Sequence, residues 1–273
     1  ANGHVSVLGG VGELADIQAA RMPDKEALVD TLNGQRFTYG KIKEYSDNLA
    51  RSLIALGMEK GDHAAIIMDN SWENVIAKIA IEKAGGVIVN LNIFETPDVL
   101  GRLLFRADVR VILLRQGIKG QNHMESIYQI CPELRMAKPG CFCCSMLPHL
   151  RHLIVTDRTQ PVGCAWQFEQ LLEDGRELEN TGLEERQRAV TPFDDATIIH
   201  TSGTGGLPKG ALLAYGQLIE NAWGIAMRLG LSDNDRFCLQ APMFHILGSI
   251  GCIMTVLMGM GTLILHERPK RET

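Results

Sequence analysis

Apolar residues follow two alternating patterns along this chain. Short runs of five or six residues, rich in apolar side chains, predict strands that are buried on both faces. Longer segments with apolar residues three and four positions apart predict amphipathic helices between these strands. The predicted strands cover residues 64–68, 87–91, 109–114, 152–156, 196–200, 236–240 and 261–265.

Helix and turn signals fill the intervals between the predicted strands. Asn33-Gly34 lies between two short apolar runs and predicts a β-hairpin. Helices are predicted over residues 13–21 and 42–56, after a cap at Asn70 or Ser71, after Thr96, and over residues 217–229 and 246–258. Strands that alternate with helices predict an α/β fold, with parallel-rich sheets and helices on both faces.

The segment from Thr201 to Gly210 is the strongest candidate for chemistry. It reads TSGTGGLPKG and follows the predicted buried strand 196–200. Its glycines let backbone N–H groups approach an anion, its hydroxyls add donors, and Lys209 adds positive charge, which together predict a polyphosphate-binding loop. It is not a Walker A loop, because Pro208 precedes the lysine and a glycine follows it. The alternative is a glycine-rich surface loop with a solvated lysine.

A second candidate follows the predicted strand 236–240. Residues 242–248 read PMFHILG, with Phe244 and His245 directly after an end of the sheet, where α/β enzymes place their ligands. A lone histidine among apolar residues is otherwise a satisfied core residue, and that reading stays open for His245. His200, directly before the glycine-rich segment, is expected to be structural.

Composition narrows the classes of protein. The chain has 273 residues, 45% of them apolar, and a net charge of -5, so it predicts one large or two small globular domains without a basic surface for nucleic acid. Its seven cysteines are an odd number, and the N-terminal residues carry no secretory-signal pattern. We therefore expect reduced thiols and a cytoplasmic location.

Two segments allow other interpretations. Cys141, Cys143 and Cys144 lie near His149 and His152, but their spacing differs from paired Cys-x-x-Cys knuckles, so free thiols are expected and a zinc site is the alternative. Residues 246–265 carry no charge and are long enough to span a bilayer, although four glycines favour a buried helix followed by a strand.

The order of residues 201–210 closely resembles the phosphate loop of the adenylate-forming superfamily, which includes acyl-CoA synthetases, luciferases and peptide-synthetase adenylation domains. Residues 36–39 and 83–92 resemble two further core motifs of that family, with Asn90 where the family has proline. Gly205 stands where the family has a second Thr or Ser. Because one hydrogen bond to a charged group contributes about 1.5–3 kcal/mol, we expect this glycine to weaken nucleotide binding.

The resemblance implies ATP-dependent activation of a carboxylate to an acyl-adenylate, followed by transfer to coenzyme A. The implied substrates are ATP with magnesium, coenzyme A and a carboxylic acid. Residues 130–151 resemble the medium-chain fatty-acyl branch, which favours a fatty acid. The loop residues implied to hold the phosphates are Thr201, Ser202, Gly203, Thr204, Gly205, Gly206 and Lys209. Those implied to border the acyl and adenylate pocket are Phe244, His245 and Gly248.

The family's enzymes are longer than this chain. We therefore expect residues 1–273 to form an incomplete N-terminal domain, with a first subdomain over about residues 1–190 and the phosphate loop and acyl-pocket region over about residues 191–273. We expect no turnover without the C-terminal domain. The alternatives are a non-catalytic nucleotide-binding module, another adenylate-forming enzyme for an aryl or amino acid, and a membrane-associated protein.

Overall fold

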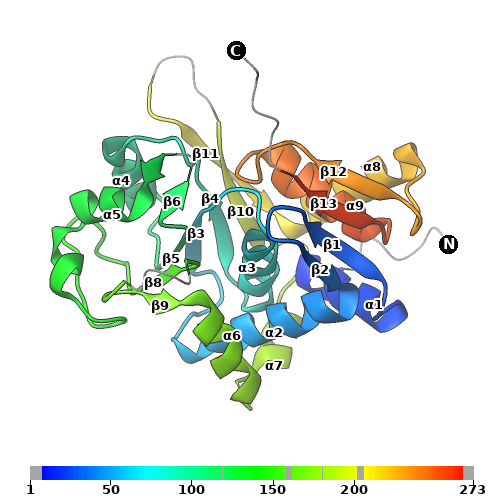
Figure 1. The fold of residues 1–273 in the computed structure, drawn as a ribbon, viewed down its shortest axis with the longest axis horizontal. Coiled ribbons are helices and arrows are strands. Elements are labelled where there is room, and N and C mark those ends of the chain that lie inside the picture. The colour runs from blue at the N-terminus through cyan, green and yellow to red at the C-terminus, as the bar shows by residue number, and fades with distance from the viewer. Residues whose placement is uncertain (1–7, 119, 158–161, 180, 202–205, 267–273) are drawn as a thin grey trace.

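The computed structural model describes residues 8–118, 120–157, 162–179, 181–201 and 206–266. Helices and strands alternate through most of this length, as the apolar pattern predicts (Figure 1). The strands are β1 (Glu26–Asp30), β2 (Gln35–Thr38), β3 (His63–Ile67), β4 (Val87–Asn90), β5 (Val111–Leu114), β6 (Gly117–Ile118), β7 (Gln121–Asn122), β8 (His152–Val155), β9 (Trp166–Gln167), β10 (Asp195–Thr201), β11 (Lys209–Ala214), β12 (Arg236–Leu239) and β13 (Thr262–Leu265). The helices are α1 (Val11–Arg21), α2 (Tyr39–Ala55), α3 (Trp72–Lys83), α4 (Pro97–Arg106), α5 (His123–Ile130), the 3-10 helix η2 (Pro132–Met136), α6 (Phe168–Glu177), α7 (Leu183–Arg188), α8 (Tyr215–Leu229), the π-helix η3 (Leu247–Met254) and α9 (Thr255–Met258).

Two sheets organise the molecule. The seven-stranded sheet has the order β11-β10-β4-β3-β5-β8-β9 and is parallel except between β10 and β11. The four-stranded sheet has the order β12-β13-β1-β2, in which only the predicted β1–β2 hairpin is antiparallel. Gly34 in that hairpin has a φ of +66°, a conformation that glycine adopts without strain. The parallel-rich α/β fold is confirmed.

Alternate residues of each central strand enter different cores. Ala64 and Ile66 of β3 face a core shared with the four-stranded sheet, whereas Ala65 and Ile67 face a core beneath α4 and α5. This period of two explains why the central strands read as continuous apolar runs. Helices therefore cover both faces of the seven-stranded sheet.

Helix α3 lies between the two sheets and is buried on all sides (Figure 1). Ser71 caps its first turn, because the Ser71 hydroxyl accepts from the Asn74 N–H at 3.4 Å. Its last residue, Lys83, donates to Asp16 and Asp47 at 2.5 Å each, which compensates the buried ammonium. Burial raises the pKa of Asp16, but the Lys83 charge and hydrogen bonds outweigh it and hold that pKa below its ordinary value.

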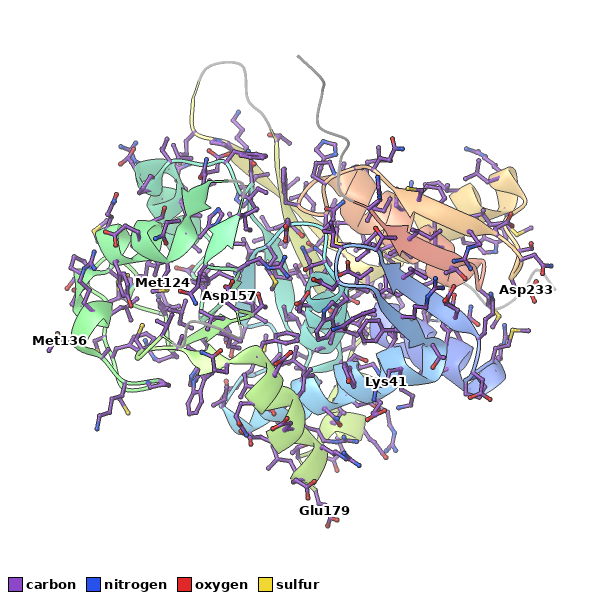
Figure 2. The ribbon with its side chains drawn as sticks, in the orientation of Figure 1. Lys41, Met124, Met136, Asp157, Glu179 and Asp233 are labelled. Atoms are coloured by element: carbon purple, nitrogen blue, oxygen red, sulfur yellow. A yellow bond between two sulfur atoms is a disulfide. The ribbon has the colours of Figure 1, made fainter. Side chains whose placement is uncertain are left out.

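A disulfide closes the irregular segment after α5. Cys131 and Cys144 are both buried against the core beneath α4 and α5, with Cα atoms 5.6 Å apart and a sulfur–sulfur bond between them. The prediction of reduced thiols is wrong for this pair, because the chain folds back on itself between the two residues and brings them together. Cys141 and Cys143 are free and exposed, and Met136 projects outward from the same segment (Figure 2). Within the described ranges, no cluster of His, Cys, Asp or Glu has the makings of a metal site.

The uncharged segment 246–265 divides as its glycines indicate. It forms η3, α9 and β13, and β13 pairs with β1 and β12 inside the four-stranded sheet. In the part of the chain that the structure describes, no helix has the length and apolarity needed to cross a bilayer. The helix predicted over residues 246–258 is present, but its first part has the wider π-helical winding, which the apolar pattern does not reveal.

Candidate functional site

The glycine-rich segment begins at the last residue of β10 and ends in β11, and these two strands form an antiparallel pair at one edge of the seven-stranded sheet. Thr201 is the last residue of β10 and faces Lys209, the first residue of β11. The Thr201 hydroxyl donates to the Lys209 carbonyl oxygen at 3.3 Å, which closes the base of the loop. The predicted residues Ser202, Gly203, Thr204 and Gly205 lie outside the described residues.

Lys209 combines exposure with freedom from competing charges. Its side chain is exposed, and among the described residues no carboxylate forms an ion pair with it. Gly206 and Thr201, two other predicted loop residues, are also exposed. An exposed ammonium with no carboxylate partner among the described residues fits a polyphosphate better than it fits a packed turn, because its N–H donors remain available.

Strand β10 joins the sheet beside β4, and both strands end at the same edge. The His200 Nδ1 donates to the Asn90 carbonyl oxygen at 3.1 Å, so His200 has the structural role that the sequence predicts. The carboxyl ends of parallel strands are the usual ligand-binding edge of an α/β sheet. The base of the loop therefore stands where this class of fold places its sites.

The histidine motif crosses the same edge of the sheet. His245 is exposed, and its Nδ1 accepts from the Leu247 N–H at 3.3 Å, so the alternative of a satisfied core histidine is wrong. Phe244 is half-buried and meets the Phe94 ring edge to face, with centroids 6.5 Å apart. Gly248 is buried, and a Cβ placed there would lie 2.1 Å from the Pro242 carbonyl oxygen. The glycine is therefore required by close packing of η3 on the motif itself.

Asn70 fixes the start of this motif, a role that sequence reasoning missed. Its Nδ2 donates to the Ala241 carbonyl oxygen at 2.9 Å, and its Oδ1 accepts from the Met243 N–H at 2.8 Å. The sequence left Asn70 and Ser71 as alternative helix caps, and Ser71 is the cap. The available signal was a polar residue soon after a predicted buried strand, since such positions lie at the ligand-binding edge.

A hollow of about 270 Å³ opens beside the motif. Its apolar wall includes Ile93, Phe94 and Phe244, and its polar side includes Asn70 and Arg115. This mixture is typical of a small-molecule pocket, because apolar walls supply affinity and a few polar groups fix orientation.

Arg115, at the end of β5, was also missed. Its guanidinium donates to Asp69 at 3.0 Å and to Glu73 at 3.2 Å. Burial raises the pKa of Glu73 above its ordinary value although Arg115 opposes that shift. Arg115 and its partner Asp69 thus bring charged groups to the polar side of the hollow.

Comparisons with known proteins agree on one family. The family model described as AMP-binding enzyme matches residues 15–273. The medium-chain acyl-CoA ligase ACSF2, mitochondrial, of Mus musculus is 32% identical over 261 residues, which cover 94% of this chain and 42% of that protein. The chain therefore spans less than half the length of this curated relative.

Solved structures share the fold at low sequence identity. The anthranilate CoA ligase AuaEII, in complex with anthranoyl-AMP, matches with a TM-score of 0.76 and 19% identity, over 96% of this chain and 46% of its own. A long-chain-fatty-acid-CoA ligase from Archaeoglobus fulgidus matches with a TM-score of 0.73 and 20% identity, over 94% of this chain and 47% of its own.

Proposed function

Because the chain belongs to the AMP-binding enzyme family, we propose that it provides the phosphate loop and part of the acyl pocket of an ATP-dependent acid–thiol ligase. In this reaction the carboxylate attacks the α-phosphorus of ATP, which gives an acyl-adenylate and pyrophosphate. The thiol of coenzyme A then displaces AMP and forms the thioester. The work of the protein at phosphorus is positioning and electrostatic stabilisation.

The observation that carries the proposal is the exposed Lys209, which has no carboxylate partner among the described residues and lies opposite Thr201 at the ligand-binding edge of the sheet. Lys209 would neutralise charge on the β- and γ-phosphates of ATP, which enters with magnesium. Thr201 and Gly206 would border the same phosphates, with Ser202 and Thr204 adding donors as the resemblance implies. Gly205 lacks a hydroxyl at the position where the family has one, so Gly205→Thr is expected to tighten ATP binding.

The hollow beside Phe244 supports a partly apolar carboxylic acid as the second substrate. Phe94 and Phe244 offer apolar surface, and His245 lies exposed beside Phe244 at the start of η3. The name of the curated mammalian relative favours a medium-chain fatty acid. An aryl acid is the competing class, because the name of one structural neighbour specifies anthranilate.

The first test is calorimetric titration of this chain with MgATP. Lys209→Ala is expected to weaken binding about 10- to 100-fold, which corresponds to a lost contact between charged groups of about 1.5–3 kcal/mol. Lys138→Ala is the matched control, because Lys138 is also exposed but lies in the disulfide segment. Equal binding by the two variants would refute the role of Lys209.

The second test uses a longer chain that includes the C-terminal domain. It is incubated with MgATP, coenzyme A and either a medium-chain fatty acid or anthranilate, and thioester formation is measured. Thioester from the fatty acid alone is the expected result. Bound ATP without any adenylate would instead favour a non-catalytic nucleotide-binding module, and thioester from anthranilate would reassign the substrate class.

A further inference from the structure

A buried lysine in α3 contacts both elements that carry the candidate site. Lys78 is only 6% exposed. Its ammonium donates to Oδ1 of Asn90, the last residue of β4, and to Oγ of Ser249 at 3.0 Å. Ser249 belongs to η3, the π-helix that follows His245. One side chain therefore bridges the central sheet and the helix of the histidine motif.

Asn90 extends this contact to the strand of the phosphate loop. Its Nδ2 donates to the Thr197 hydroxyl of β10 at 2.8 Å, and that hydroxyl donates to the Ile88 carbonyl oxygen at 2.9 Å. The Asn90 carbonyl oxygen accepts from His200 at 3.1 Å, directly before Thr201. The side-chain Nδ2 and the backbone carbonyl oxygen of Asn90 therefore both hold β10 in place.

Lys78 and Lys83 are both buried, but only Lys83 is held by an ion pair among the described residues. Lys83 is on the same helix and has two carboxylates within 2.5 Å. In the described part of the chain no carboxylate forms an ion pair with Lys78, and Glu82 acts on it only through space. Burial lowers the pKa of Lys78 to about 7, since the charged form loses its hydration. Its stabilising contacts are the two neutral oxygens of Asn90 and Ser249.

We propose that Lys78 is a positioning residue that holds η3, and with it His245, in a fixed position relative to β10, whose last residue is Thr201. The proposal rests on the function proposed above, in which both elements serve one reaction. A buried hydrogen-bonded network can fix a unique arrangement because each member is costly to leave unsatisfied. Lys78 thereby couples the acyl side of the site to its phosphate side.

The test compares Lys78→Met, which removes the donors, with Lys78→Gln, which retains a donor without the charge. A cavity of about 20 Å³ beside Lys78, with room for about one water, allows the shorter glutamine to complete its hydrogen bonds through water. Lys83→Met is the matched control on the same helix. Two quantities are measured below the unfolding transition of every variant: hydrogen exchange of the backbone amides in η3 and β10, and the Kd for MgATP.

Lys78→Met is expected to speed amide exchange in η3 and β10 about tenfold and to raise the Kd about tenfold, because it removes the hydrogen bonds to both Asn90 and Ser249. Lys78→Gln is expected to restore both values to within about threefold. Lys83→Met is expected to lower the unfolding midpoint without changing either value. If Lys78→Met does not fold, Ser249→Ala removes only the η3 contact and is expected to act in the same direction.

Three results would overturn the proposal. The first is unchanged exchange in η3 after Lys78→Met or Ser249→Ala. The second is faster exchange with an unchanged Kd, which would make Lys78 a purely structural residue. The third is an equal effect of Lys83→Met. If the unaltered chain does not bind MgATP, the proposed function fails, and the exchange rates of η3 and β10 then decide separately whether Lys78 couples these elements.

Discussion

Gly248→Ala tests whether close packing within the histidine motif shapes the candidate site. A Cβ at this position would lie 2.1 Å from the Pro242 carbonyl oxygen and 2.8 Å from that of Ala241. Both atoms are backbone, and Asn70 holds that backbone by two hydrogen bonds. The clash therefore cannot be relieved by rotating a side chain.

The magnitude follows from three contributions. Overpacking costs about 1–3 kcal/mol, and the upper end applies here because the opposing atoms are restrained. Displacing the motif from Asn70 costs about 1 kcal/mol for each hydrogen bond lost. Alanine recovers about 1 kcal/mol relative to glycine in a helix. Taken together, these contributions predict that Gly248→Ala lowers the free energy of unfolding by about 2–4 kcal/mol.

The assay is urea unfolding followed by tryptophan fluorescence, with Gly251→Ala as the matched control in the same π-helix. A Cβ at Gly251 would lie 3.2 Å from the Leu247 Cδ1, the end of an exposed side chain that can rotate, and 3.9 Å from the Ile246 carbonyl oxygen, an ordinary contact distance. The control is expected to change stability by less than about 1 kcal/mol. Equal stability of the two variants would refute the packing explanation of Gly248.

Three further predictions concern stability. Reducing the Cys131–Cys144 disulfide, which closes a loop with a sequence separation of 13, is expected to cost about 2–3 kcal/mol in urea unfolding with and without reductant. Asp16→Asn leaves Lys83 with one carboxylate and is expected to cost about 1–3 kcal/mol at neutral pH, because Asp16 is partly exposed. The depressed pKa of Asp16 gives the sign of its pH dependence: its contribution is complete above its ordinary pKa of 3.8 and is lost as the pH falls through the lower folded value. Gly175→Ala would place a Cβ 1.9 Å from a backbone oxygen of α2 and is expected to lower the thermal midpoint by several degrees.

Each of these three predictions has a control substitution of the same kind at a position where the structure predicts little effect. Cys141→Ser changes a free, exposed thiol and should leave the effect of reductant intact. Asp98→Asn removes a solvated pair with Arg102 and should change stability by less than about 1 kcal/mol. Gly224→Ala, on α8 with open space around it, should stabilise by about 0.5–1 kcal/mol. If a control changes stability as much as the variant it is paired with, the structural explanation given for that variant is wrong.

The sequence predicted the fold where local patterns decide it. The apolar run 64–68 became β3, Asn33-Gly34 became a hairpin turn, and the stretch before Thr201 became β10, because burial on two faces leaves a readable signature. Thr201 and Lys209 lie at facing ends of β10 and β11. Phosphate binding by this loop, the role of His245 and the cytoplasmic location stay predictions.

What the sequence did not reveal depends on partners that are distant along the chain. Lys78 and Ser249 are 171 positions apart, so no local window links them. The same applies to Asn70 and the histidine motif, whose carbonyl oxygen and amide become neighbours only after the sheets pack. The Cys131–Cys144 disulfide depends on how an irregular segment closes, a geometry that composition does not encode.

The position of α3 between the sheets has a consequence for synthesis on the ribosome. The partners of Lys83, which are Asp16 and Asp47, precede it in the chain, so this end of the helix can be satisfied as soon as it emerges. Lys78 must wait until Ser249 has been translated before its second partner exists. Because chains fold from the N-terminus during translation, Lys78, in the middle of α3, has only its Asn90 partner through most of elongation. The contact between α3 and the helix of the histidine motif therefore forms late, after Ser249 has been translated.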